Sequence, residues 1–402
     1  MPLMTNAETN TLDWQVEVCL DSSIQFQCPL SKHLSEPKSI FLTGATGFLG
    51  VHLLNELLKT HTADIYCLIR CDNIEEGRNR LKKTLEFYLL WQDTFSDRII
   101  PVVGDLGKPL LGLSPVEFHE LAGIIDIIYH NGAWVNSARP YSTLKAVNVL
   151  GTQEVIRLAS LQQSKPIHFT STLGFFLNKT HFLTEKITET DIPNIYALKG
   201  GYRQSKWVAE QLIMIAQSRG MVACIYRPAR IIGHSKTGLN GNFQDFLCIL
   251  LKACIQLKKI PNLKTQINIV PVDYISQAIV GLSQANFSGK TFHLLNPYPT
   301  EWELFFNSIC SLGYSLEKIS YDQFLAEIKH QSSQNPKNKL YSSLFLLLKI
   351  SKLFSPNELK FDANWTLAQL LDRSITCAPV NEELLNLYFS NFQRIGYFPP
   401  QT

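Results

Sequence analysis

Short apolar runs alternate with amphipathic segments from residue 38 to about residue 172. The runs are SIFLT at 39–43, DIYCLI at 64–69, RIIPVV at 98–103, GIIDIIYH at 123–130 and PIHFTST at 166–172. The spacing of apolar residues between them predicts helices from about Phe48, near 75–91 and near 141–162. Strands that alternate with helices and are apolar along nearly their whole length are typical of a parallel sheet covered on both faces. The pattern therefore predicts an α/β fold with a doubly wound, Rossmann-type sheet.

The alternation becomes looser after Thr172. A helix is expected around 200–217 and a strand at 221–228, followed by Gly- and Asn-rich loops at 233–243, and helical patterns dominate beyond about 300. We therefore divide the chain into three parts. A leader over 1–36, wrapped on the surface or partly disordered, precedes a Rossmann domain over 37–298 with an insertion near 235–265. A smaller, mostly helical region follows over 299–402.

Composition excludes several classes of protein. The 402 residues carry a formal charge of only +3, so no nucleic acid or anionic membrane partner is implied. Nine cysteines show no CxxC pair or metal-ligand spacing, so we expect reduced thiols and no metal site. No secretory signal is visible, and the apolar stretch at 342–354 is interrupted by lysines and too short to span a bilayer. It is expected to form a buried amphipathic helix, in a cytoplasmic protein without a membrane span.

A glycine-rich turn follows the first strand. Thr43-Gly44-Ala45-Thr46-Gly47-Phe48-Leu49-Gly50 lies between a strand and a helix, which is the context that a dinucleotide-binding turn requires. Gly44 allows the tight turn, Gly47 allows the pyrophosphate to approach the backbone, and Gly50 allows close packing of helix on sheet. The phosphates would bind at the helix N-terminus.

The end of the second strand indicates which dinucleotide is bound. An NAD-selective site would place Asp or Glu about 20 residues after the glycines, whereas this strand ends in Arg70. A guanidinium suits the 2′-phosphate of NADP(H), with Arg80 as a second contact, although Arg70 as a solvated strand-end cation is the alternative. Asp105 is placed to meet the adenine amino group. The run Asn131-Gly132-Ala133 would pass beneath the ribose and nicotinamide.

Tyr202 and Lys206 are the candidate catalytic pair. Their i, i+4 spacing puts both side chains on one helix face, where a neighbouring ammonium would lower the pKa of the phenol. A hydroxyl at the end of the fifth strand, Ser171 or Thr172, would donate a hydrogen bond to the substrate oxygen. Asn148 on the preceding helix either holds a water that relays protons to Lys206 or distorts or caps its helix.

These motifs identify the chain as an extended short-chain dehydrogenase/reductase. More narrowly, it resembles the thioester reductase domains that end nonribosomal peptide synthetases and carboxylic acid reductases. The resemblance runs from about residue 38 to the end, through IFLTGATGFLG, YCLIR, VVGDL, IYHNGAWVN, PYSTLKAVNVLGTQEVIRLA, HFTSTL, GGYRQSKWVAE, YRPARIIGHSKTG, NIVPVDYISQAI and NEELLNLYFSNFQRIGYFPP. It favours Thr172 over Ser171. The full set of expected NADP(H) contacts is Thr43, Gly44, Thr46, Gly47, Phe48, Leu49, Gly50, Arg70, Arg80, Asp105, Leu106, Asn131, Gly132, Ala133, Asn148, Ser171, Lys206, Arg227, Pro228 and Ile231.

The resemblance implies reduction by NADPH of an acyl or peptidyl thioester carried on the phosphopantetheine arm of a carrier protein. Thr172 and Tyr202 would hold the oxyanion, Tyr202 would supply a proton, and an aldehyde would be released, with further reduction to the alcohol as an extension. The region over 299–402 would bind the acyl group, and the protein would act as a monomer.

The chain departs from the family pattern at Ala229, where the family has glycine, and in the loop NSARP at 136–140, which lacks the expected aromatic residues. It contains no adenylation or carrier domain, so we expect either a free-standing reductase or an excised terminal domain. Two alternatives remain open. One is another extended reductase acting on fatty acyl-CoA or a free carbonyl or alcohol, and the other is a non-catalytic NADP-binding regulator.

Overall fold

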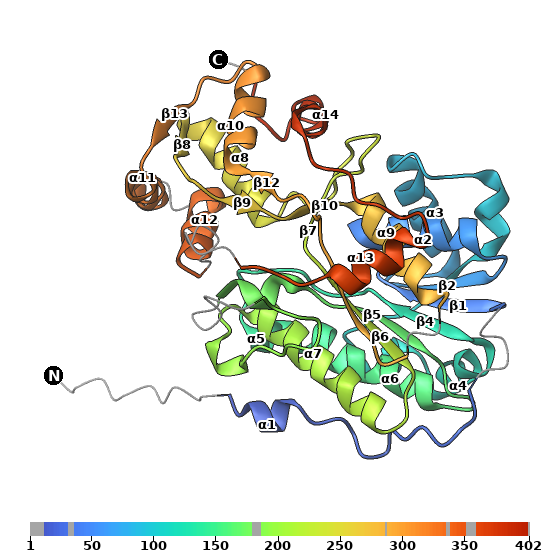
Figure 1. The fold of residues 1–402 in the computed structure, drawn as a ribbon. Coiled ribbons are helices and arrows are strands. Elements are labelled where there is room, and N and C mark those ends of the chain that lie inside the picture. Colours follow the sequence, from blue (N-terminus) through green and yellow to red (C-terminus); the bar gives the residue numbers. More distant parts are fainter. Residues whose placement is uncertain are drawn as a thin grey trace.

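The computed structural model describes residues 12–30, 36–178, 186–285, 288–334, 338–350 and 359–400. Its centre is a seven-stranded parallel sheet in the order β11-β6-β5-β4-β1-β2-β3 (Figure 1). The strands are β1 Ser39–Thr43, β2 Asp64–Ile69, β3 Ile99–Val103, β4 Ile127–His130, β5 Ile167–Thr170, β6 Ala223–Pro228 and β11 Thr291–Leu294. The order reverses beside β1, at the switch point where such sheets bind dinucleotides.

Helices cover both faces of this sheet, which confirms the predicted fold class. One face carries α2 Phe48–Thr60, α3 Ile74–Phe87 and α9 Val272–Ser283, and the other carries α4 Pro115–Ile124, α6 Gly151–Ser160 and α7 Gly201–Ser218. Successive residues of β1 show the alternation. Ile40 and Leu42 pack into the core under α2, while Phe41 packs into the core on the opposite face.

The single helix expected near 141–162 is divided in three. It consists of α5 Tyr141–Lys145, a π-helical turn over Ala146–Leu150, and α6. Asn148 lies in the π turn. Its side-chain amide oxygen and nitrogen form hydrogen bonds with residues outside its own helix. Helix distortion, one of the two roles expected for Asn148, therefore describes what the structure shows, since π turns occur at such sites of local rearrangement.

A second group of elements forms its own apolar core. It contains α8 Phe246–Leu257, α10 Trp302–Ser311, α11 Tyr321–Gln334, α12 Lys339–Ile350 and α14 Glu382–Arg394. Short strands pair within it or at its base: β8 Lys259–Pro261 with β13 Glu317–Ile319, β9 Gln266–Ile267 with β12 Thr300–Glu301, and β7 Arg230–Ile232 with β10 Ile269–Pro271. The apolar stretch from 342 supplies the buried Leu344 and Leu348 of α12, and its end at 351–354 lies outside the described residues.

The chain crosses between the two units more than once. Helix α8 leaves the sheet domain early, and α13 Asn364–Leu371 returns to it late. Trp365 of α13 stacks on Phe292 of β11 with ring centroids 5.4 Å apart. The C-terminal hundred residues are thus divided between both units rather than forming one continuous block.

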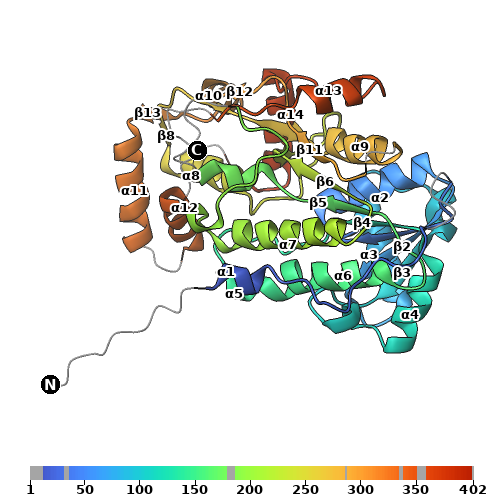
Figure 2. The same ribbon diagram turned by 60° about the horizontal axis from the view of Figure 1, so that its bottom comes forward.

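Residues 12–30 of the leader lie along the helices of the sheet domain (Figure 2). Trp14, in the short helix α1 Trp14–Glu17, packs edge-on against Tyr141 of α5 with ring centroids 5.2 Å apart. Glu17 accepts a hydrogen bond from the Tyr141 hydroxyl at 2.5 Å and pairs with Lys145 at 2.8 Å. This part of the leader is therefore anchored to the surface. Across the described ranges, no helix is long and apolar enough to cross a bilayer.

Candidate active site

The glycine turn has the backbone that a dinucleotide cradle needs. Gly44 has φ +76°, a conformation that other residues rarely adopt. A Cβ on Gly50 would lie 1.8 Å from the carbonyl oxygen of Gly44, so only glycine allows the first turn of α2 to approach this closely. Gly44, Thr46, Gly47, Phe48 and Leu49 line the cavity described below, whereas Gly50 lies behind them as a packing residue.

A buried hydrogen-bond chain supports this turn. The Thr43 hydroxyl accepts from the amide of Gly132 at 2.8 Å and contacts Nδ1 of His130 at 2.8 Å, and Nε2 of His130 contacts the Thr152 hydroxyl at 2.9 Å. Burial lowers the pKa of His130 to about 3, so its ring is neutral and links the two hydroxyls. Thr43, expected as a cofactor contact, therefore holds the strand ends of β1 and β4 together through its side chain.

Arg70 and Arg80 have different roles. Arg70 is exposed at the end of β2 and lines the cavity, as a 2′-phosphate contact should. Arg80 does not line it, because its guanidinium donates to the carbonyl oxygen of Arg70. Arg80 therefore fixes the backbone of Arg70, and its expected phosphate contact stays a prediction.

The other expected cofactor contacts also separate into two groups. Asn131, Gly132, Ala133, Ser171, Lys206, Pro228 and Ile231 line the cavity, while Asp105, Leu106, Asn148 and Arg227 do not. The Asp105 carboxylate accepts from the amide of Gly107 at 2.9 Å, and Leu106 packs under Gly132 and Gly151. The Asn148 side chain binds both backbone groups of Trp134 and the hydroxyl of Ser205, so its place among the cofactor contacts is corrected to a bridge between the loop after β4 and α7.

Helix α7 brings Tyr202 and Lys206 to the cavity. Gly201 begins the helix, and a Cβ there would lie 2.3 Å from the backbone nitrogen of Tyr141, so the helix start is fixed against α5. Nζ of Lys206 donates to the carbonyl oxygen of Thr170 at 2.6 Å and lies 4.0 Å from the ring centre of Phe169. The pair is thereby held at the carboxyl end of β5.

The protonation of this pair differs from the expectation. Burial raises the pKa of Tyr202 to about 12, where a lowered value was expected. Burial also lowers the pKa of Lys206 to about 7, against the opposing effect of Glu210. The direction differs because burial alone shifts the pKa of the Tyr202 phenol. A phenol of this kind is protonated at neutral pH and is suited to donate a proton.

The two hydroxyls after β5 are used differently. The Ser171 hydroxyl is buried and donates to the carboxylate of Glu210. The Thr172 oxygen accepts from the amide of Gly174 at 2.9 Å, which leaves its hydrogen available for a ligand, and Thr172 lines the cavity beside Tyr202. This arrangement supports the choice of Thr172 over Ser171.

Arg227, expected at the cofactor, has a structural role instead. Its side chain is fully buried and pairs with Glu210 at 2.6 Å, and it also donates to the carbonyl oxygen of Glu189 at 3.1 Å. Because Glu210 also accepts from Ser171 and follows Lys206 by four residues, this one carboxylate ties β6, α7 and the end of β5 together. Glu210 was not expected from the sequence, although its i+4 spacing from Lys206 was a visible signal.

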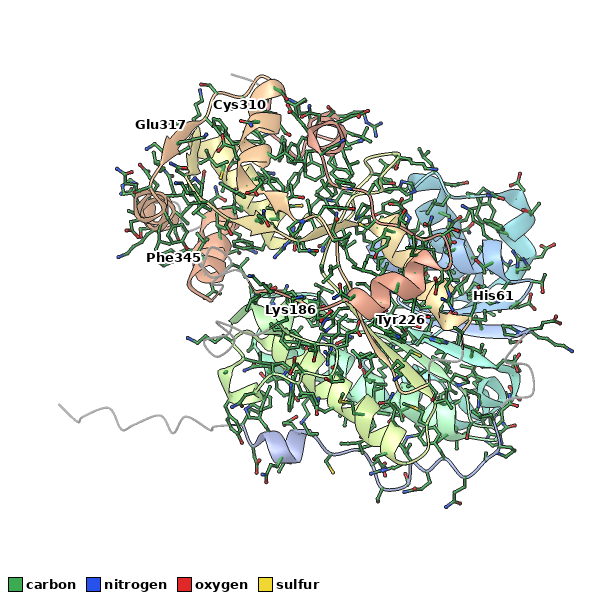
Figure 3. The ribbon with its side chains drawn as sticks, in the orientation of Figure 1. His61, Lys186, Tyr226, Cys310, Glu317 and Phe345 are labelled. Atoms are coloured by element: carbon green, nitrogen blue, oxygen red, sulfur yellow. The ribbon has the colours of Figure 1, made fainter. Side chains whose placement is uncertain are left out.

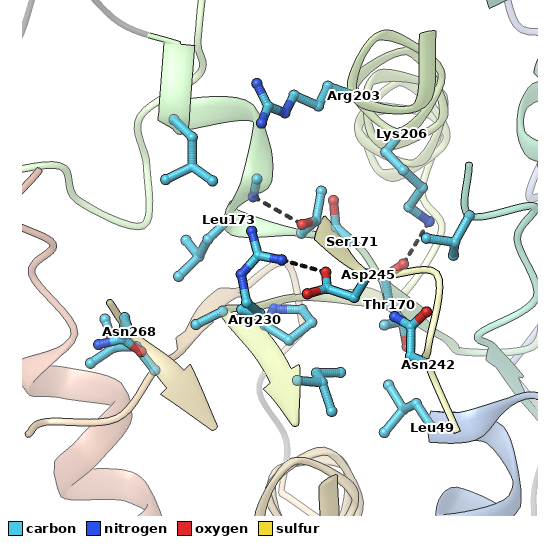
Figure 4. Close-up of a pocket in the computed structure, with 18 of the residues that line it drawn as sticks. Leu49, Thr170, Ser171, Leu173, Arg203, Lys206, Arg230, Asn242, Asp245 and Asn268 are labelled. Atoms are coloured by element: carbon cyan, nitrogen blue, oxygen red, sulfur yellow. Dashed lines mark hydrogen bonds and ion pairs between the residues drawn. The ribbon is translucent and has the colours of Figure 1, made fainter. Parts of the chain in front are cut away.

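One cavity of about 1180 Å³ joins these groups and extends between the sheet and the C-terminal helices. Figure 4 shows part of its lining, and Figure 3 places Lys186, which also lines it, at the junction of the two units. The described lining residues include seven cations and one carboxylate, Asp245. The cations are Arg70, Lys186, Lys199, Arg203, Lys206, Arg230 and Lys360. Such a charge balance, in a chain of net charge +3, fits a polyanionic ligand.

The fold, the glycine turn and the Tyr202–Lys206 pair define an extended short-chain dehydrogenase/reductase, and the cradle with Arg70 at its end fits NADP(H). The model of the Male sterility protein family matches residues 42–279, more than half of the chain. The chain therefore belongs to that family.

The chain is also similar to individual proteins of known function. It is 38% identical over 384 residues to one of the linear gramicidin synthase subunits of Brevibacillus parabrevis, a match that covers 95% of this chain and 8% of that protein. It is 33% identical over 389 residues to the L-2-aminoadipate reductase large subunit of Eremothecium gossypii, covering 90% of this chain and 28% of that one. The chain thus spans less than a third of the length of these relatives.

Among solved structures, the terminal R domain from the myxalamid PKS-NRPS biosynthetic pathway matches with a TM-score of 0.89 and 38% identity. The match covers 96% of this chain and 98% of that domain. The expected family resemblance, fold class, oxidoreductase class and NADP(H) cofactor are confirmed. In the described residues, no group of three or more His, Cys, Asp or Glu side chains is arranged to hold a metal ion.

Proposed function

We propose that this chain reduces an acyl or peptidyl thioester, presented on the phosphopantetheine arm of a carrier protein, to an aldehyde and a free thiol. The observation that carries the proposal is a cavity that joins a dinucleotide cradle, a free hydroxyl donor and a protonated phenol to the space between the two units. Similarity over nearly the full length of the myxalamid terminal R domain supports it.

NADPH, when bound, supplies a hydride to the thioester carbonyl carbon. The residues of this chain then act on the oxygen of that carbonyl. The Thr172 hydroxyl donates a hydrogen bond to it as negative charge develops, and the Tyr202 phenol donates a proton. Collapse of the resulting thiohemiacetal re-forms the C=O bond, breaks the C–S bond and releases the thiol. Lys206, fixed to the Thr170 carbonyl, would hold the nicotinamide ribose.

We also propose which parts of the chain bind the cofactor and which bind the acyl group. Residues 37–298 bind NADP(H), and the insertion near 235–265 with residues 299–402 binds the acyl group. Support comes from the cavity lining, which includes Phe246 and Leu347 of the second apolar core. We also propose that the protein acts as a monomer in the cytoplasm. Light scattering of the purified protein would test the oligomeric state.

The test is NADPH consumption by the purified chain with acyl-pantetheine and acyl-carrier thioesters, beside free aldehydes and alcohols, with products identified by mass. Thioester-dependent consumption should fall at least about 100-fold in Tyr202→Phe. The matched control is Tyr196→Phe, which alters an exposed tyrosine. Turnover only of free carbonyls would replace the proposal with a small-molecule reductase. Cofactor binding without turnover of any substrate would replace it with a regulatory role.

A further inference from the structure

Arg203 has a buried guanidinium nitrogen without a protein partner. It follows Tyr202 on α7, and its Nη1 is inaccessible to solvent and makes no hydrogen bond within the described part of the chain. Burial of an unpaired cationic donor costs free energy, and structural arginines are accordingly paired, as Arg227 is with Glu210. The unpaired nitrogen of Arg203 therefore indicates a donor directed at a ligand.

Arg230 is a second cation that lines the same cavity. It pairs with Asp245, but this carboxylate also caps α8 by accepting from the amide of Leu247 at 2.8 Å. Burial, and then the nearby charge of Arg230, lower the pKa of Arg203 to about 10, so Arg203 remains charged at neutral pH. Two cations thus face one carboxylate, which leaves an excess positive charge.

The position of this excess charge separates it from the cofactor cradle. Both arginines line the cavity, together with Thr172 and with residues of the second unit such as Asn268. In Figure 4, Arg203 and Leu49, which belongs to the cradle, lie on opposite sides of the view, with Arg230 between them. Arg203 therefore lies away from Leu49 within the same cavity, which also contains Thr172.

We propose that Arg203 and Arg230 form a subsite for an anionic oxygen group of the thioester substrate. The group is either a carboxylate on the acyl chain or the phosphodiester of the arm, since a guanidinium binds both through charge-assisted hydrogen bonds. The proposal rests on the proposed function, and it deepens that function by making substrate charge a determinant of specificity.

The experiment compares substrates that differ only in charge. Adipoyl-pantetheine is compared with hexanoyl-pantetheine to test the carboxylate, and hexanoyl-phosphopantetheine with hexanoyl-pantetheine to test the phosphate. We expect the wild-type kcat/KM to favour one charged member, and Arg203→Met to reduce that preference about 10- to 100-fold. Arg203→Lys, which keeps the charge without the planar fork, should restore part of it.

Two controls separate a binding role from a structural one. Arg78→Met removes an identical charge from the exposed surface of α3 and should leave the preference unchanged. Arg203→Met should not lower the melting temperature, because its buried nitrogen has no partner to lose. Equal loss of activity on charged and neutral substrates, or a preference that survives in Arg203→Met, would overturn the proposal.

A binding measurement keeps this test independent of turnover. With NADPH present, adipoyl-pantetheine or hexanoyl-phosphopantetheine should raise the melting temperature of wild type more than hexanoyl-pantetheine does, and Arg203→Met should abolish the difference. If no thioester is reduced but this difference is found, the proposed function fails and the anion subsite stands. Equal shifts for charged and neutral ligands in wild type would refute the subsite.

Discussion

Replacement of Gly50 by alanine tests the cradle directly. The new Cβ would lie 1.8 Å from the carbonyl oxygen of Gly44 and 2.7 Å from its carbonyl carbon, both backbone atoms that have no side-chain freedom to move. Ordinary contact begins at 3.4 Å, so α2 must move by about 1.6 Å, the difference between 3.4 and 1.8. Because Thr46, Gly47 and Phe48 lie at the start of α2, the cradle must move with it.

A displacement of about 1 Å in a positioned group costs on the order of 100-fold, or about 2.7 kcal/mol. We therefore expect Gly50→Ala to weaken NADPH binding at least about 100-fold, measured by fluorescence titration. Overpacking should also lower the free energy of unfolding by about 1 to 3 kcal/mol, measured in urea.

Gly47→Ala is the matched comparison. Its Cβ would lie 3.2 Å from the same carbonyl oxygen, which needs a shift of only a few tenths of an ångström. Gly47 lines the cavity, so this variant should lose NADPH affinity while keeping wild-type stability. The reasoning fails if Gly50→Ala binds NADPH within about threefold of wild type and unfolds at the same urea concentration.

Three further changes have defined outcomes. Glu210→Ala leaves Arg227 buried without its carboxylate and should lower the free energy of unfolding by about 3 to 5 kcal/mol in urea titrations; a loss below about 1 kcal/mol would contradict the role given to the pair. Arg70→Ala should raise the Kd for NADPH about 10- to 100-fold and change that for NADH only slightly, whereas equal losses would reject Arg70 as the phosphate contact. Lys206 has a lowered pKa of about 7 against an unfolded value of 10.5, so the unfolded state binds more protons between these values and wild-type stability should rise with pH across that window. Lys206→Met should remove this rise. If the stability of the two proteins changes with pH in parallel, the pKa of Lys206 is not lowered by burial.

The sheet and the cradle could be predicted from sequence because their signals are local. Strands apolar on both faces, a glycine turn between strand and helix, and the i, i+4 spacing of Tyr202 and Lys206 each occupy a few consecutive residues. The direction of the Tyr202 pKa could not be predicted, since it depends on burial by residues distant in the sequence. The hydrogen bond from the Arg80 guanidinium to the carbonyl oxygen of Arg70 could not be predicted either, because it joins a helix residue to the end of a strand ten positions earlier.

Arg227 and Arg203 show why the role of an arginine could not be predicted from the local sequence. Both are arginines near motif residues, and nothing in the local sequence distinguishes them. One is neutralised by Glu210 from α7, while the other has a buried nitrogen that meets no protein partner within the described residues. Only the tertiary arrangement of carboxylates decides which arginine is structural and which remains available to a ligand.

The early departure of α8 from the sheet domain has a consequence during synthesis. Its apolar side chains, among them Leu247 and Leu251, are completed by Phe389 and Phe392 of α14, which lie some 140 positions later in the chain. At about 5 to 20 residues per second, a ribosome needs roughly 7 to 28 seconds to make the chain between them. During that interval α8 displays an uncovered apolar face on a nearly finished sheet. Chaperone binding and aggregation of nascent chains should therefore depend on when α14 covers this face, and less on folding of the sheet that binds the cofactor.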